Sequence, residues 1–176
     1  MSATASVRRL GPAEVEAYRA LMLEAYGNDP EAFTSSVAER AALPLSWWEN
    51  RLDPAPDAQE MNWGAFVDGQ LVGVVGLGFM QREKERHKAH LFGMYVQPAQ
   101  RGLRLGRALV TAALEGARAR NGVRVVSLTV TEGNAPAEAL YARCGFERFG
   151  VEPMAVCIAG RDFSKVHMVC KLESGA

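Results

Sequence analysis

The sequence has no long hydrophobic run and no excess charge of either sign. No stretch approaches the roughly 18 uninterrupted apolar residues of a membrane-spanning helix, and residues 1–7 are mostly small and polar, so we expect a soluble protein that stays in the cytoplasm. Twenty basic and twenty acidic side chains cancel. The overall field therefore offers no general attraction for nucleic acid or for an anionic membrane surface.

Cysteine is also scarce. Cys144, Cys157 and Cys170 are odd in number and form no Cys-x-x-Cys pair. Neither a disulfide framework nor a zinc site is indicated, which fits a reducing cytoplasm and a protein without a metal. Cys144 lies close to Tyr141, but nothing near it indicates a depressed thiol pKa, so we interpret it as a small buried residue.

What the sequence does have is enough apolar residues for one core. It has 176 residues, 48% of them hydrophobic, which predicts a single domain over residues 1–176. Periodicity and turn residues predict strands over 7–10, 63–67, 71–75, 90–96, 123–130, 146–151, 154–158 and 166–172, and helices from about 12 to 26, over 36–52 with a break, over 104–120 and over 135–144. This order indicates an α+β fold with a mixed, mostly antiparallel twisted sheet flanked by helices.

Local patterns sharpen some of these elements. Residues 68–69 are Asp-Gly between apolar runs, which predicts a tight hairpin turn. Residues 36–39 and 46–49 each read as a capping box, with Pro44 between them. Residues 123–130 are nearly continuous in β-branched residues, which predicts a strand buried on both faces.

The most informative motif lies at residues 96–109, where a predicted strand runs into a glycine-bearing loop that opens a helix. The free N–H groups of a first helical turn converge, and the helix dipole adds positive charge there, so the place suits a phosphate. Gly102 and Gly106 permit close backbone approach, while Arg101, Arg104 and Arg107 add local positive charge. The alternative is a plain strand-to-helix turn with surface arginines.

A second motif bears on that choice. Residues 134–146 follow a predicted buried strand and run from an asparagine through a tyrosine to Gly-Phe. Together with the loop at 101–106, they resemble the Gcn5-related N-acetyltransferase (GNAT) family, most closely over residues 91–146. The resemblance implies the GNAT fold over nearly the whole chain, acetyl-CoA as co-substrate, and transfer of its acetyl group to a primary amine.

The resemblance also implies which residues hold acetyl-CoA. The backbone of Met94, Tyr95 and Val96 would pair with the pantetheine arm as an added strand does. The pyrophosphate would lie on the loop and its helix, at Arg101, Gly102, Leu103, Arg104, Leu105, Gly106 and Arg107. Asn134 would bond to the pantetheine arm, and Tyr141 would lie near the sulfur.

The loop departs from the family pattern at one position. Arg104 stands where the family has its first motif glycine, so a positive φ there carries a cost, and we expect the side chain to point away from the pyrophosphate. This departure keeps open an alternative function, a non-catalytic acyl-CoA-binding regulatory module of the same fold. The presence of both Asn134 and Tyr141 argues against that alternative.

The reaction needs an acid and a base. A phenol of pKa ~10 near the sulfur can protonate the departing thiolate, which makes Tyr141 the candidate acid. Its alternative role is to pack a helix onto the sheet. An alkyl ammonium of pKa ~10.4 must lose a proton before it attacks.

The resemblance places the base at His90, where lysine-directed members of the family have a glutamate. Histidine suits the task, because an unperturbed pKa of ~6.5 leaves it neutral at physiological pH. The alternative for His90 is an edge-of-strand residue with no role. Other candidates for the base are Glu83, Glu85, His87 and His167.

The acceptor is not specified by the sequence. We favour a small-molecule amine over a protein amine, because the chain has no charge bias suited to a polymer. Trp47 and Trp48 fall in the segment that covers the acceptor pocket in the family, but adjacent residues cannot share one helix face, so one of them is expected in the core. The loop holding Glu31, Phe33 and Ser35 is placed to close over a substrate.

Two further implications concern partners and rivals. The family resemblance implies a homodimer through the closing strands. An oxidoreductase with a dinucleotide-binding loop is disfavoured, because the glycines are too few and too late in the chain and hairpins precede them.

Overall fold

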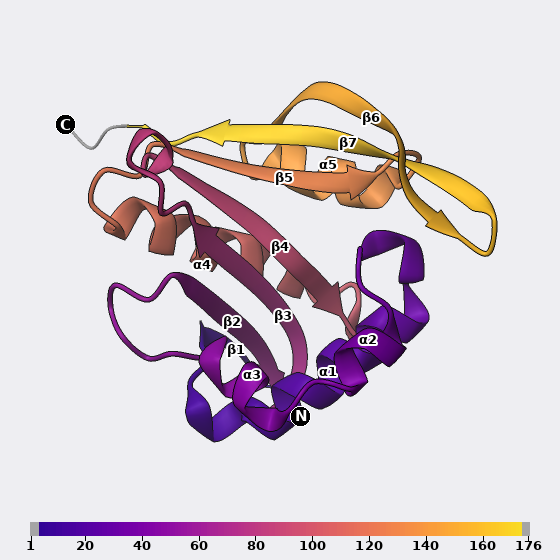
Figure 1. Ribbon diagram of the computed structural model, residues 1–176. Helices are drawn as coiled ribbons and strands as arrows, with labels where there is room; N and C mark the ends of the chain where they lie inside the picture. The colour runs from indigo at the N-terminus through magenta and orange to yellow at the C-terminus, as the bar shows by residue number, and fades with distance from the viewer. Residues whose placement is uncertain (1–3, 174–176) are drawn as a thin grey trace.

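A computed structural model describes residues 4–173. Its centre is a seven-stranded sheet in the order β1-β2-β3-β4-β5-β7-β6 (Figure 1). The strands are β1 Ala5–Arg9, β2 Glu60–Val67, β3 Gln70–Phe79, β4 Lys88–Val96, β5 Val125–Thr131, β6 Glu147–Ile158 and β7 Arg161–Lys171. The helices are α1 Val15–Asn28, α2 Val37–Ala41, α3 Leu45–Asn50, α4 Leu105–Ala119 and α5 Ala135–Arg143, with 3₁₀ turns η1 Pro12–Glu14, η2 Pro30–Ala32, η3 Glu83–Glu85 and η4 Pro98–Gln100.

The expected mixed, mostly antiparallel α+β fold is confirmed. Each pair of neighbouring strands is antiparallel apart from β4 and β5, which are parallel. The Asp-Gly hairpin is confirmed as well: Asp68 and Gly69 both have positive φ, 48° and 81°, as the turn requires. None of the helices in residues 4–173 is long and apolar enough to cross a membrane.

Two apolar clusters hold helices against the sheet. On one face α4 contributes Leu109, Val110 and Ala113, all fully buried, to a core shared with β2, β3, β4 and β5. On the other face Tyr18 of α1 and Trp48 of α3 are fully buried and meet edge to face at 5.8 Å. Burying large apolar surfaces on both faces fixes the central strands in a rigid frame.

The broken helical segment is present, with one correction at its second start. The box at Ser36 and Glu39 forms, because Glu39 N donates to Ser36 Oγ at 3.2 Å and Ser36 N donates to Glu39 Oε2 at 2.7 Å. The second predicted box is wrong. Pro44, with an extended ψ of 157°, is itself the N-cap of α3, so Ser46 lies inside the helix.

The closing strands also differ from the prediction. The strands expected over 146–151 and 154–158 are one strand, β6, whose register against β7 shifts between Glu152 and Val156. Pro153 lies in that irregular stretch, and an edge strand tolerates proline because its outer groups need no partner. β7 begins at Arg161 rather than at 166, directly after a turn at Ala159 and Gly160.

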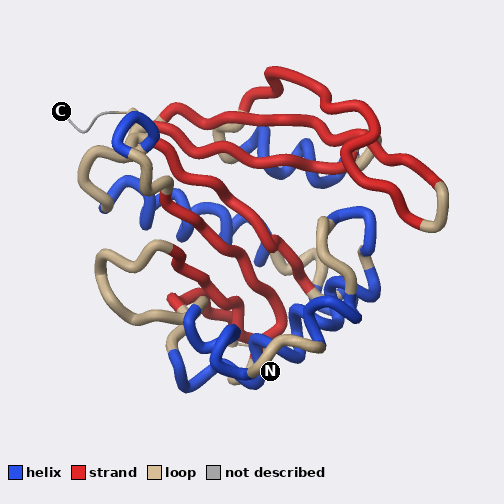
Figure 2. Tube along the Cα trace, in the orientation of Figure 1, coloured by secondary structure: helices blue, strands red, loops and turns tan. Residues whose placement is uncertain are grey.

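The feature that positions the site is an incomplete pairing between β4 and β5. Their register runs only from Lys88 opposite Val125 to His90 opposite Ser127, while β4 continues to Val96. Beyond that point the two strands diverge (Figures 1 and 2). The composition of β5 predicted burial on both faces, and this prediction is wrong. Ser127 is half-buried and Thr129 is exposed at the gap.

A bulge in β4 accompanies the divergence. Phe92 lies opposite Gly76 and Tyr95 opposite Val74, so β4 has one residue more than β3 over this stretch. Gly93 has a φ of 63° there, in the left-handed region that glycine enters at little cost. The extra residue reverses which side chains face each cluster, so that Tyr95 faces α1 while Leu91 faces α4.

The packing of α4 on β2 predicts opposite outcomes for two helical glycines. A β-carbon at Gly116 would overlap the indole of Trp63, whereas one at Gly27 in α1 would meet its nearest atom, on Val37, at 3.7 Å. Gly116→Ala should lower the free energy of unfolding by about 1–3 kcal/mol. Gly27→Ala should leave it equal or raise it by up to about 1 kcal/mol. Urea unfolding measures both, and equal effects would contradict the packing described.

Candidate active site

A cavity of about 1290 Å³ opens where β4 and β5 diverge. Residues from β4, the loop after it, the first turns of α4 and α5, the segment around η2 and the start of β7 form its walls. Helices α4 and α5 both present their N-terminal ends to it, and each such end carries free N–H groups and positive dipole charge. The cavity therefore favours an anionic ligand at one end.

The wall formed by β4 has unpaired backbone groups. On the side facing β5, the strand from Leu91 to Val96 has no strand partner. Met94, Tyr95 and Val96, whose backbone is expected to pair with the pantetheine arm, all line the cavity. An extended chain of amide groups can add to such an edge as a further strand.

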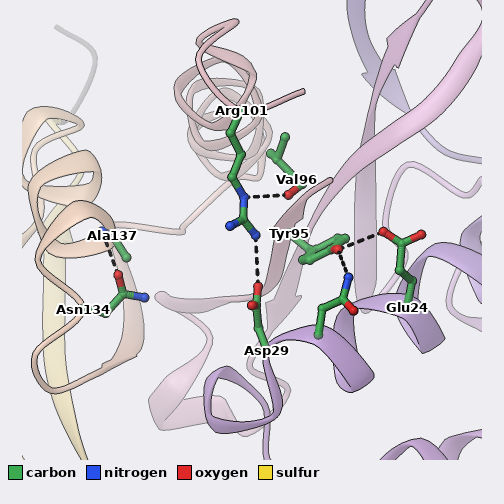
Figure 3. Close-up of polar contacts among 8 residues, drawn as sticks. Glu24, Asp29, Tyr95, Val96, Arg101, Asn134 and Ala137 are labelled. Atoms are coloured by element: carbon green, nitrogen blue, oxygen red, sulfur yellow. Dashed lines mark hydrogen bonds and ion pairs between the residues drawn. The ribbon is translucent and has the colours of Figure 1, made fainter. Parts of the chain in front are cut away.

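The loop after β4 folds back over this edge (Figure 3). Arg101 Nε donates to the carbonyl oxygen of Val96 at 3.1 Å, and Arg101 Nη2 donates to Asp29 Oδ2 at 3.2 Å. The side chain of Tyr95 turns to the other face, where its hydroxyl donates to Glu24 Oε1 at 2.9 Å. Tyr95 thus offers the cavity its backbone, while its ring ties β4 to α1.

The start of α4 has the geometry of an anion site. Helical bonding begins where Ala108 N donates to Arg104 O at 3.2 Å, which leaves the N–H groups of residues 105–107 without helical partners. The first turn of α4 packs closely on β4 at Gly106, because a β-carbon there would lie only 3.1 Å from Met94 Cε. Of the predicted loop residues, Leu103 does not line the cavity and is 51% exposed.

Arg104 has the positive φ that the sequence analysis expected to carry a cost. It is the N-cap of α4, with φ 58° and ψ 19°, in the left-handed region. For a residue with a β-carbon this costs roughly 1–2 kcal/mol. The loop keeps the shape that a glycine would give it, at the expense of stability.

Asn134, the N-cap of α5, and Tyr141, near the C-terminal end of that helix, both line the cavity. The Oδ1 atom of Asn134 caps the helix by accepting from Ala137 N at 3.3 Å, and its amide nitrogen points away from that bond (Figure 3). Tyr141 is 6% exposed and meets Phe146 edge to face at 5.9 Å. Burial raises the pKa of the Tyr141 phenol above its ordinary value, so the phenol keeps its proton at neutral pH.

Among the base candidates, His90 lines the cavity and the other four do not. Its Nδ1 lies 3.1 Å from Ser127 Oγ, at the last paired position of β4 and β5. Burial, and then the nearby charge of His167, lower the pKa of His90 below its ordinary value. His167 itself is paired elsewhere, 2.9 Å from Glu152 Oε2.

A lysine that the sequence did not single out ties down the segment over the cavity. Lys165 on β7 is 5% exposed, and its Nζ donates to the carbonyl oxygen of Glu31 at 2.5 Å and to Thr131 Oγ1 at 3.0 Å. Burial lowers the pKa of this ammonium group. The bonds hold η2 against β5 and β7, so that Phe33 lines the cavity. The one sequence cue was a lysine beside an apolar run.

Two other expectations are settled by burial. Trp48 is fully buried in the core, whereas Trp47 is half-buried and lines a smaller hollow next to the main cavity. Cys144 is partly buried, and burial raises the pKa of its thiol, so it lacks the thiolate character of a nucleophile.

The comparisons with known proteins agree with this geometry. A model of the acetyltransferase (GNAT) family matches residues 18–146. The chain therefore belongs to the acetyltransferase (GNAT) family. The match covers β4, β5, the loop after β4 and the helices α4 and α5, and it ends before β7.

Relatives and solved structures extend the likeness along the chain. A mycothiol acetyltransferase from Salinispora tropica is 31% identical over 137 residues, 78% of this chain, and the chain spans 42% of that relative's length. An L-methionine sulfoximine/L-methionine sulfone acetyltransferase from Pseudomonas aeruginosa is 26% identical over 97% of this chain and 96% of its own. A structure of yncA from Salmonella typhimurium with its cofactor acetyl-CoA has a TM-score of 0.80 at 22% identity, covering 98% of this chain and 96% of that one.

The left-handed conformation of Arg104 predicts that a glycine there is stabilising. Arg104→Gly should raise the free energy of unfolding by about 1 kcal/mol, because glycine enters this region without the steric cost of a β-carbon. Arg104→Ala keeps the β-carbon and is the matched control, expected to change little. Urea unfolding of the three proteins checks this, and equal stability of the glycine and alanine variants would contradict it.

Proposed function

We propose that this protein transfers the acetyl group of acetyl-CoA to a primary amine of a small molecule, by direct attack in a ternary complex. The observation that carries the proposal is the unpaired edge of β4 beside the free N-terminus of α4. The strand edge can bind the amide groups of a pantetheine arm, and the helix N-terminus can bind a pyrophosphate. The family match and the cofactor named for yncA support the same ligand.

The residues present fit that ligand. The backbone of Met94, Tyr95 and Val96 would pair with the pantetheine arm, and the free amide nitrogen of Asn134 would donate to it. The N–H groups of residues 102–107 would hold the pyrophosphate, and Arg101, Arg104 and Arg107 would supply positive charge. For this, Arg101 would first release its hydrogen bond to the carbonyl oxygen of Val96. Leu103 would contribute its backbone alone, since its side chain is exposed.

Two cavity residues have the protonation states that the reaction needs. In its neutral form, His90 would accept a proton from the ammonium group of the acceptor, directly or through a water, and the resulting amine would then attack. Tyr141 would donate its proton to the departing sulfur. Burial favours the uncharged form of both groups, lowering the pKa of the histidine and raising that of the tyrosine.

The acceptor proposed is a small molecule. A relative that matches this chain over nearly its full length is named for L-methionine sulfoximine and L-methionine sulfone, which are small amines. A protein amine is the second candidate acceptor, and a non-catalytic acyl-CoA-binding module is the alternative function. A thiol-release assay with acetyl-CoA and a broad amine panel separates these, because binding without turnover would favour the module.

The remaining parts of the proposal concern setting and assembly. We propose a single acetyltransferase domain over residues 1–176 that works in the cytoplasm without nucleic acid or membrane. Among residues 4–173, no group of three or more His, Cys, Asp or Glu side chains is placed to hold a metal ion, and the proposed chemistry uses none. A homodimer would use β6, an edge strand on which Phe149 and Met154 are 64% and 71% exposed.

The proposed acid predicts a specific loss in Tyr141→Phe. Removing the hydroxyl should lower kcat by about 10²–10⁴-fold, the usual contribution of a positioned general acid. The Kd for coenzyme A should change little, because the ring still packs on Phe146. Thiol release measures kcat and calorimetry measures Kd. An unchanged kcat would leave Tyr141 with a packing role alone.

The proposed base predicts an acidic limb in the pH profile. Because burial lowers the pKa of His90, kcat/KM should fall only below about pH 6.5, the ordinary value for histidine. His90→Gln keeps a polar group beside Ser127 but cannot accept the proton, so it should lower kcat/KM and remove that limb. Profiles between about pH 5 and 9 check this. A limb that survives in His90→Gln would assign the base to another group.

A further inference from the structure

An arginine outside the acetyl-CoA half of the cavity is buried with part of its side chain free. Arg51 follows α3 and is 9% exposed. Its Nε donates to Glu60 Oε1 at 2.7 Å. Within residues 4–173, neither terminal nitrogen of its guanidinium makes a hydrogen bond to the protein, and neither is among the fully buried atoms without a partner, so both are open to the space beside them. Such donors are available to an anionic ligand, and hydrogen bonds that involve a charged group are the stronger ones.

The free end of Arg51 faces space that a ligand can enter. Arg51 lines the main cavity and also the smaller hollow beside it, which is bounded by Trp47, Glu49 and residues 53–60 among others. Its neighbour in the cavity wall is Phe92, whose ring centre lies 5.2 Å from the guanidinium carbon. Phe92 and His90 are two residues apart on β4, before the bulge, so they lie on the same face of the strand.

Aromatic rings hold the guanidinium in place. The ring of Trp47 lies 4.8 Å from the guanidinium carbon and that of Tyr18 lies 5.9 Å away, in addition to Phe92. Such contacts orient the planar group without using its N–H donors. A bidentate pair with a planar oxyanion needs two parallel N–H groups in a fixed plane, which the two terminal nitrogens supply.

The charges around Arg51 differ between the two spaces that it lines. In the main cavity basic side chains outnumber acidic ones, and Arg40 is among them, with its guanidinium carbon 4.5 Å from the ring centre of Trp47. Among the described residues, the buried Nε of Arg40 has no acceptor. The smaller hollow also contains Glu49, Asp53, Asp57 and Glu60, and Glu60 pairs with Arg51. The acids at the other end of the cavity are paired there, Asp29 with Arg101 and Glu132 with Arg148.

We propose that Arg51 determines acceptor specificity by binding a carboxylate of the acceptor, so that the substrate class is a small primary amine that also carries a carboxylate. This inference rests on the proposed function and deepens it. Arg51 holds the carboxylate between its aromatic neighbours, and the amine lies toward His90 on the same face of β4. Amines without the carboxylate cannot form this charge-assisted bidentate pair and are poorer acceptors, because hydrogen bonds to a charged group contribute more to binding than neutral ones.

Matched acceptors test this most directly. L-Methionine sulfone, L-leucine and L-phenylalanine are each compared with their own carboxamides, with acetyl-CoA, by thiol release. The wild-type protein should show kcat/KM at least about 10-fold higher for the free acid in the pair that it uses best, the range expected for hydrogen bonds to a charged group. Equal rates for acid and amide would overturn the inference while leaving the acetyltransferase proposal intact. Turnover of none of the amines would overturn both.

Variants tie the preference to Arg51. Arg51→Lys keeps the charge beside Glu60 but lacks the planar fork, and should lower kcat/KM for the acid about 10- to 100-fold while changing that for the amide less than about 3-fold. If Arg51→Lys fails to fold, the double variant Arg51→Gln/Glu60→Gln replaces it. The double variant removes the ion pair without leaving one charge unpaired, and it should abolish the preference for the acid. Arg118→Lys, on an exposed position of α4, is the matched control. The same factor of loss for acid and amide in both variants would assign Arg51 a structural role only.

Discussion

The structure depends on a parallel pair of strands that stops pairing partway. β4 and β5 share hydrogen bonds only as far as His90 and Ser127, and the backbone beyond them needs other partners. An all-antiparallel sheet would have closed this gap. Here the gap exposes a strand edge and brings the N-terminal ends of α4 and α5 to one cavity. Edge amides, helix N–H groups and dipoles then supply most of the ligand-binding chemistry without unusual side chains.

Burial acts in opposite directions on the two proposed catalytic groups. A low-polarity environment favours the neutral form of any ionisable side chain, so it lowers the pKa of His90 and raises that of Tyr141. One becomes a better-populated base at neutral pH and the other keeps the proton it is to donate. The same physics makes a buried arginine informative, since guanidinium does not neutralise and must find partners. Within the part of the chain that the structure describes, the Arg51 side chain hydrogen-bonds to Glu60 alone, and Arg51 lines the cavity.

The fold, and the gathering of the loop and helix residues at one end of the cavity, could be predicted from the sequence because they depend on local patterns. Apolar periodicity located the elements, and the glycines with an adjacent helix start located the loop. Predictions failed where a longer-range contact overrides local preference. β-branched composition suggested a strand buried on both faces, but β5 borders the gap. The separate strands expected over 146–151 and 154–158 are one strand, because an edge strand accommodates Pro153.

The sequence by itself determined the order of the elements, the glycine-bearing loop that opens a helix and the presence of Asn134 and Tyr141 after a strand, because each follows from residues close together in the chain. The tertiary structure alone decided which side chains meet. Lys165 reaches the carbonyl of Glu31 from β7, and Arg51, which follows α3, meets Phe92 on β4. Spacing carries no record of such pairs, since they arise only when the sheet brings distant segments together and burial leaves their polar groups few partners.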